Sequence, residues 1–117
     1  MTQARDSRDL AITQVRNLAA AATTLLEQAA AAPAGRAALT LVAGAGVPLK
    51  QTLLAFRGGV QVAEHDAPGP ATLQVLRGRV RLVTSEESRE LGQGDHLQLP
   101  STRHRLESRP KTVTSTR

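Results

Sequence analysis

The pattern of apolar and polar residues divides this chain into two parts with different periods. In the first part, apolar residues recur three or four positions apart, as they do on one face of an α-helix. This spacing predicts a helix from about Arg8 to Ala31. Ser7 or Asp6 would cap its start, and Pro33 would end it. The apolar stripe of this helix contains Ala11, Val15, Leu18, Ala22, Leu25 and Ala29.

In the second part the period falls to two, and Gly and Pro residues separate the short apolar runs. Alternation of this kind, broken by frequent turns, indicates an all-β sandwich or barrel. The last strand is expected to be a polar edge strand, because Val113 is its one apolar residue. The predicted strands lie near residues 37–43, 49–56, 59–65, 72–77, 79–84, 88–91, 95–99, 103–108 and 112–116.

The change of period predicts a helical extension at residues 1–35 and one β-domain at residues 36–117. At 117 residues the chain can bury a core without disulfides or structural metals. The helix stripe is rich in alanine and therefore shallow, which lets it pack closely against its own sheet. Its alternative role is a contact between two copies of the chain, and we expect a homodimer.

Composition removes several classes of function. The chain has no Cys, which excludes thiol catalysis and Cys-based zinc sites. It has one Phe and no Trp or Tyr, so it lacks the rings on which single-stranded nucleic acid stacks. The net charge of +5 comes from scattered arginines, and the one tight set, Arg77, Arg79 and Arg81, is expected to face solvent. We therefore expect no nucleic-acid partner.

A membrane segment is not expected either. The longest weakly polar run, from Leu18 to Leu26, is far shorter than the roughly 20 residues that a spanning helix needs. The acidic residues before this run and the polar ones after it also argue against a signal peptide. We expect a cytoplasmic protein.

Two stretches of glycine and histidine in the β-part have a characteristic spacing. In the first, Gly59 precedes a strand that ends at His65, and Gly78 closes the stretch. In the second, Gly94 is followed by five residues, a proline and, shortly after, His104. Together with the strings ATLQVLRGRV and GDHLQLP, this order resembles the cupin superfamily, in particular its small single-domain bacterial members.

The resemblance covers about residues 49–107 and implies an all-β fold, a single jelly-roll β-barrel with an N-terminal α-helix. The usual metal site of cupins has three histidines and one glutamate. The corresponding positions here hold His65, Ala67, Ala71 and His104, so two ligands remain. Open catalytic metal sites generally keep at least three protein ligands. A divalent ion is therefore expected to bind poorly unless another group completes the set.

Strand alternation identifies the residues that would face the inside of the barrel. If His65 points inward, Ala67 does as well, and Ala71 and Leu73 share the inner face of the next strand. Gln51, on an earlier strand, is a candidate neutral ligand or hydrogen-bond partner. The expected apolar lining consists of Leu53, Leu73, Val75, Val80, Leu82, Leu97, Leu99 and Leu106.

Three classes of function follow from these residues. The first is binding of a small molecule in the barrel, with His65 and His104 as polar groups in an apolar cavity. The second is a metal-dependent cupin enzyme of dioxygenase or isomerase type that uses the same two histidines. The third is a structural or regulatory role in which the helix contacts a partner. The histidines can also be packed remnants of an ancestral metal site, and no catalytic residue is assigned.

Overall fold

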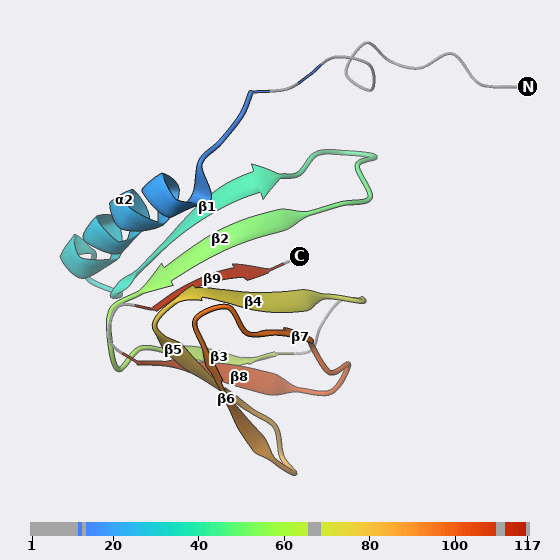
Figure 1. The fold of residues 1–117 in the computed structure, drawn as a ribbon. Helices are drawn as coiled ribbons and strands as arrows, with labels where there is room; N and C mark the ends of the chain where they lie inside the picture. The colour runs from blue at the N-terminus through green and yellow to red at the C-terminus, as the bar shows by residue number, and fades with distance from the viewer. Residues whose placement is uncertain (1–11, 13, 66–68, 110–111, 117) are drawn as a thin grey trace, which may run out of the picture.

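The described part of the protein consists of two antiparallel β-sheets and one helix (Figure 1). The computed structural model describes residues 12, 14–65, 69–109 and 112–116, and only the backbone of 63–65 and 112–116. The larger sheet has the order β1-β2-β9-β4-β7 and the smaller one β3-β8-β5-β6. The strands are β1 (Arg36–Val42), β2 (Gln51–Phe56), β3 (Gln61–His65), β4 (Thr72–Arg77), β5 (Arg79–Val83), β6 (Ser88–Gly92), β7 (His96–Gln98), β8 (His104–Ser108) and β9 (Thr112–Thr116).

The predicted strand bounds agree with the observed ones to within about two residues. The prediction that the last strand, β9, lies at the edge of a sheet is wrong. β9 pairs with β2 on one side and with β4 on the other, so it is an interior strand of the larger sheet rather than an edge. Alternating threonines on either side of Val113 explain this position, because β-branched residues suit a paired strand even when they are polar.

The helix α2 (Leu18–Ala31) begins ten residues later than predicted. Residues 14–17 are not helical, and the side chain of Asn17 accepts a hydrogen bond from the backbone N–H of Ala20. Asn17 is therefore the N-cap, and the helix begins at the next residue. The predicted stripe is confirmed at Ala22, Leu25 and Ala29, which are buried, whereas Val15 is exposed.

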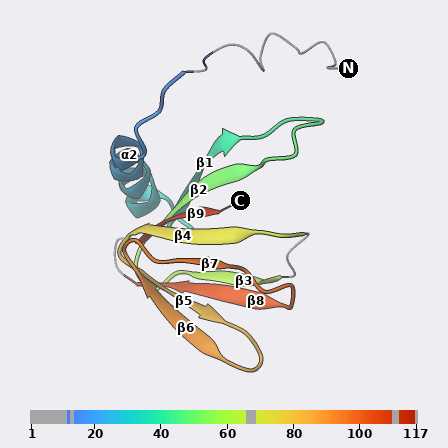
Figure 2. The same ribbon diagram turned by 45° about the vertical axis from the view of Figure 1, so that its right-hand side comes forward.

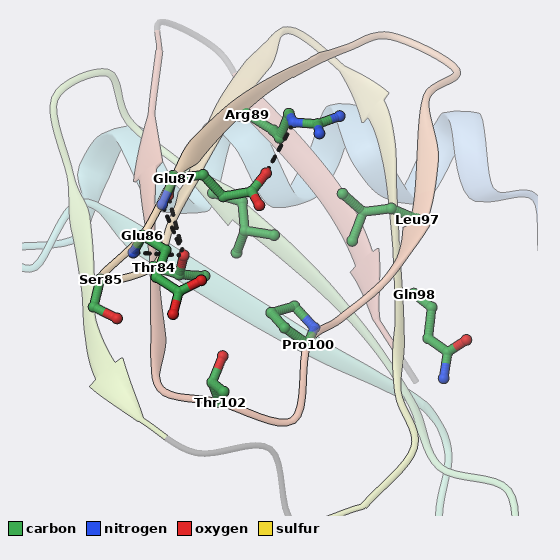
Figure 3. Close-up of a pocket in the computed structure, with 10 residues that line it drawn as sticks. Thr84, Ser85, Glu86, Glu87, Arg89, Leu97, Gln98, Pro100 and Thr102 are labelled. Carbon is green, nitrogen blue, oxygen red and sulfur yellow. Dashed lines mark hydrogen bonds and ion pairs between the residues drawn. The ribbon is translucent and has the colours of Figure 1, made fainter.

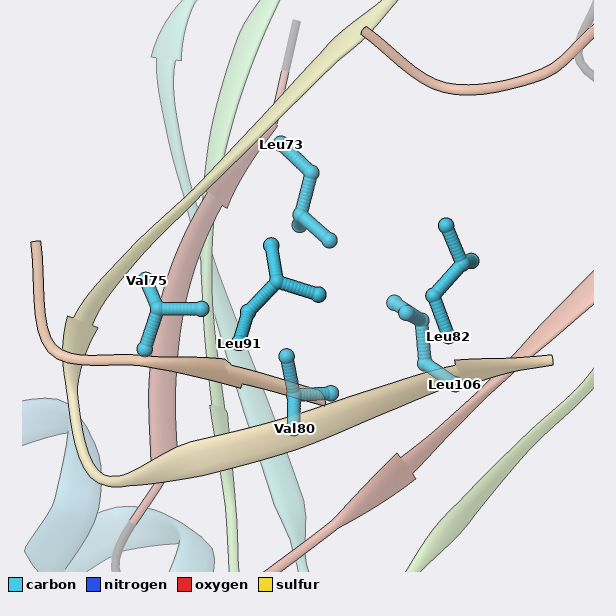
Figure 4. Close-up of a cluster of buried hydrophobic side chains, with 6 residues drawn as sticks. All are labelled: Leu73, Val75, Val80, Leu82, Leu91 and Leu106. Carbon is cyan, nitrogen blue, oxygen red and sulfur yellow. The ribbon is translucent and has the colours of Figure 1, made fainter. Parts of the chain in front are cut away.

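Two hydrophobic layers lie on opposite faces of the larger sheet. Figures 1 and 2 show α2 on one side of this sheet and the smaller sheet on the other. One joins α2 to that sheet through Ala22, Leu25, Ala29, Leu53 and Ala55. The other fills the space between the two sheets (Figure 4). Its members are Leu73, Val75, Val80, Leu82, Leu91 and Leu106.

The sequence predicted that Leu53 lines the space between the sheets. The structure places it instead in the layer between α2 and the larger sheet. The helix packs on β1 and β2 of its own chain, which confirms the first of the two roles considered for it. Within the described ranges, no helix combines the length and the apolar character that crossing a bilayer requires.

Two arginines join the helix to the sheet by hydrogen bonds. Arg77, at the end of β4, donates to the hydroxyl of Thr23 and to the carbonyl of Ala19, both at 2.9 Å. Arg57 donates to the carbonyls of Ala30 and Ala32 near the end of α2. The prediction that Arg77 faces solvent is confirmed only in part, because the residue is half-buried where α2 covers this part of the sheet.

Candidate functional site

The two predicted site histidines are brought together by the smaller sheet. β3 and β8 pair in antiparallel fashion, and His65 and His104 are direct partners in the register. A register shift between Val62 and His65 marks an irregularity in β3 just before this pair. The side chain of His65 lies outside the described part of the structure.

His104 points into the molecule. Along β8 the buried residues are His104, Leu106 and Ser108, which alternate with half-buried ones. Its side chain is 1% exposed, and Leu106, the next inward residue, belongs to the core between the sheets. The Nδ1 atom of His104 lies 3.0 Å from the carbonyl oxygen of Thr102. Since a carbonyl only accepts hydrogen bonds, this contact places the proton on Nδ1.

A pocket of about 400 Å³ opens at the same end of the molecule, and we call it the mouth pocket. One wall comes from the turn that joins β5 to β6, and the other comes from β7 and the loop that follows it (Figure 3). Its volume falls within the range of about 300–1,000 Å³ that is typical of small-molecule sites. The residues that line it are Leu82, Thr84, Ser85, Glu86, Glu87, Arg89, Leu97, Gln98, Pro100 and Thr102.

The mouth pocket has an apolar base and a polar rim. Leu82 belongs to the core between the sheets and Leu97 packs against that core. The rim carries hydroxyl, amide and charged groups, among them the carboxylate of Glu87 and the guanidinium of Arg89, which form an ion pair at 3.2 Å. Such a combination suits a small molecule that has one apolar face and several polar groups.

The turn that forms one wall is held by Thr84. Its hydroxyl oxygen accepts hydrogen bonds from the backbone N–H groups of Glu86 and Glu87, at 3.3 and 3.2 Å. The backbone N–H of Thr84 donates to the carbonyl of Glu87 at 2.8 Å. A threonine that satisfies backbone donors in this way fixes a tight turn, so this wall has a defined shape.

The remaining predicted residues lie in different surroundings. Leu73 is fully buried in the core between the sheets, and Ala71 lines a small pocket of about 80 Å³ with Thr72 and Gln98. Gln51 shares a face of β2 with Leu53, whose side chain packs against α2, so it lies on the helix side of the larger sheet. Ala67 lies outside the described residues.

A complete metal site is not found among the described side chains, where no three His, Cys, Asp or Glu residues form a group able to hold an ion. His104 is the one histidine whose side chain is described in the interior, because His96 is exposed on β7 as predicted. Ala71 offers a methyl group where cupins usually have a carboxylate. The described residues therefore do not fit the usual four-ligand metal set.

Comparison with solved structures identifies the fold. A conserved protein of unknown function from Streptococcus pyogenes is 20% identical, with a TM-score of 0.64 over 73% of this chain and 74% of that one. A cupin superfamily protein from Desulfitobacterium hafniense is 18% identical, with a TM-score of 0.63 over 69% of this chain and 73% of that one. No family model and no curated protein matches the sequence.

A third similar structure is an enzyme. The salicylate 1,2-dioxygenase of Pseudaminobacter salicylatoxidans is 18% identical, with a TM-score of 0.67 over 83% of this chain but only 32% of that one. These likenesses show the fold alone. The chain has a cupin-type fold, mostly β with one helix, which confirms the resemblance found in the sequence.

The sequence predicted His104 and, among the apolar lining, Leu82 and Leu97, but it missed the polar residues that line the mouth pocket. Thr84, Glu87 and Arg89 lie in and beside the turn between β5 and β6, and their charged string reads as an ordinary solvated loop. A signal was present, because Thr followed by SEE before a strand is typical of a hydroxyl-stabilised turn. Nothing in the string indicates that this turn faces β7.

Proposed function

We propose that this protein binds a small, partly polar molecule in the mouth pocket. The two sheets then form the walls of a cupin barrel that is open at the end where His104 lies. The observation that carries the proposal is the contact between His104 and Thr102, which connects the buried interior to one wall of the pocket. A buried imidazole with a fixed hydrogen bond holds the loop in place, and the loop gives the pocket its shape.

His104 acts in this proposal as a positioning residue. Among the described residues, it lies behind the lining of the pocket rather than in it, and Thr102 lies in between. His65, its partner in the register, is proposed to support the same end of the smaller sheet. Direct contact with the ligand then comes from rim groups such as Gln98 and Arg89.

The test is a titration of ¹⁵N-labelled protein with salicylate, citrate, glycine and glucose, followed by amide chemical shifts. We expect at least one probe to shift the amides of the mouth pocket, at Thr84, Glu87, Gln98 and Thr102. Thr102→Trp, which fills the pocket, should abolish the shifts. Ser101→Trp adds the same ring at an exposed neighbour that does not line the pocket, and it should preserve them.

Two outcomes would contradict this proposal. One is that no probe shifts these amides, and the other is that shifts persist unchanged in Thr102→Trp. Amide spectra of both tryptophan variants also report whether each is folded, so a loss of binding can be assigned to the pocket.

The competing proposal is a metal-dependent cupin enzyme that uses His65 and His104. It is supported by the adjacent register positions of the two histidines and by the similarity to a dioxygenase. Elemental analysis of protein purified without added metal separates the two functions. Iron, nickel, manganese or zinc near one equivalent, lost in His104→Ala, would favour the enzyme. Metal well below one equivalent in wild type would favour binding without metal.

Assembly and location are proposals of the same kind. We propose a cytoplasmic homodimer without a nucleic-acid partner. Light scattering of the purified protein measures the mass directly, and a monomer at micromolar concentration would contradict the dimer.

A further inference from the structure

A second hollow lies on the other side of the larger sheet, between α2 and the ends of β2 and β4. Its volume is about 570 Å³. Figures 1 and 2 show α2 lying along this outer face, away from the smaller sheet. We call this hollow the helix cleft, and its walls include Thr23, Leu26, Ala30, Phe56, Arg57 and Arg77.

The helix cleft differs chemically from the mouth pocket. Most of its surface is apolar, and Phe56, the one aromatic residue of the chain, forms part of it. Two of its walls carry guanidinium groups, which belong to Arg57 and Arg77. Glu27 adds one carboxylate, so the charged groups of the cleft have a net positive sum.

Both guanidinium groups are held in place by the helix. Arg77 is fixed by Thr23 and the carbonyl of Ala19, and Arg57 uses its Nη1 atom for two carbonyls near the helix end. An arginine carries five N–H donors in a rigid fork, so each retains donors beyond these bonds. Among the described residues, the Nε and Nη2 groups of Arg57 donate to no acceptor and remain able to bind an anion.

We propose that the helix cleft binds an amphiphilic anion, a carboxylate with a straight alkyl chain. The alkyl chain lies against Leu26, Ala30 and Phe56, and the carboxylate pairs with Arg57 or Arg77. Charge complementarity selects this occupant. The exposed apolar segment that carries Ile12 and Val15 is a poorer occupant of the cleft. Arg16 directly follows this segment, and its positive charge would be repelled by the two arginines of the cleft. This proposal is independent of the mouth pocket.

The test compares three probes with the same alkyl chain by calorimetric titration. Decanoate should bind roughly tenfold more tightly than decyltrimethylammonium, because one charge is attracted and the other repelled. Decanol should lie between them. Equal affinity for all three would overturn the proposal, because it would show that the guanidinium groups play no part.

A matched pair of variants locates the binding. Ala30 and Ala31 are both exposed near the end of α2, but only Ala30 lines the helix cleft. Ala30→Glu adds a carboxylate inside the cleft and should weaken decanoate binding roughly tenfold, whereas Ala31→Glu should leave it unchanged. Thr102→Trp, in the mouth pocket, should also leave it unchanged. Circular dichroism melting checks that each variant is folded.

Other results would overturn the proposal. Equal effects of Ala30→Glu and Ala31→Glu would place decanoate elsewhere. A wild-type dimer that Ala30→Glu converts to a monomer, without any decanoate binding, would show that the cleft is an interface between copies.

Discussion

The two ends of β8 carry the two buried polar side chains of the described interior, Ser108 and His104, and use them differently. The hydroxyl of Ser108 accepts from the N–H of Val60 and lies 2.9 Å from the carbonyls of Arg57 and Val60. These hydrogen-bond partners belong to the turn between β2 and β3. His104 contacts Thr102, in a loop that borders a pocket.

This contrast teaches how one short strand serves two purposes. At the Ser108 end, the buried polar group closes a turn against the sheet and no residue that lines the mouth pocket is involved. At the His104 end, the buried polar group supports a loop whose far side faces open space. Substitutions at the first end should therefore change stability, and substitutions at the second should change binding.

The largest effect is expected midway between the two ends. Leu106→Ala should lower the free energy of unfolding by about 2–5 kcal/mol, because it leaves a cavity in the core between the sheets. Urea denaturation measures this loss. Leu49→Ala, at an exposed position, should change the same quantity by less than about 0.5 kcal/mol. Similar losses for both variants would contradict the assigned core.

A smaller effect is expected at the Ser108 end. Ser108→Ala should cost about 1–3 kcal/mol of unfolding free energy, because it leaves partly buried backbone groups of the turn without their side-chain partner. The exposed Ser101→Ala serves as control and should be neutral. If Ser108→Ala impairs binding in the mouth pocket but not stability, the comparison between the two ends is wrong.

The smallest effect on stability is expected in the pocket wall. Thr84→Val removes the hydroxyl that accepts from Glu86 and Glu87, but this turn is exposed, so water replaces the bonds. The unfolding free energy should fall by about 1 kcal/mol or less. The amide shifts of residues 84–87 should change clearly, and binding of the probe molecules should weaken. An unchanged turn spectrum would contradict the role of Thr84.

Much of the fold was predictable because several strands, such as β5 and β8, alternate buried and less buried residues. The two-residue spacing of Leu73 and Val75 in β4, and of Val80 and Leu82 in β5, was enough to predict each strand and its buried face. The start of α2 was not predictable, because residues 12–17 continue an apolar spacing while the Asn17 cap ends the helix. The place of β9 depends on its partners β2 and β4, which are distant in sequence.

The candidate site was predictable only in part, for a related reason. The spacing that resembles cupins led to His104, and the pairing of β3 with β8 places His65 opposite it in the register. The mouth pocket depends instead on how the turn at Thr84 faces β7, two segments that share no local pattern. Parity alone does not say which face of β2 the helix covers, so the sequence did not place Gln51 on the helix side of the larger sheet.

The most direct test of the account is a pair of substitutions at His104, measured by titration with the best of the four probes in a chelator. His104→Asn places an amide N–H near the position of Nδ1 and can still donate to Thr102, whereas His104→Leu cannot. We predict that His104→Asn binds within about threefold of wild type and that His104→Leu binds roughly tenfold more weakly. Binding that the chelator abolishes in wild type, or equal losses in both variants, would contradict a metal-free pocket positioned by His104.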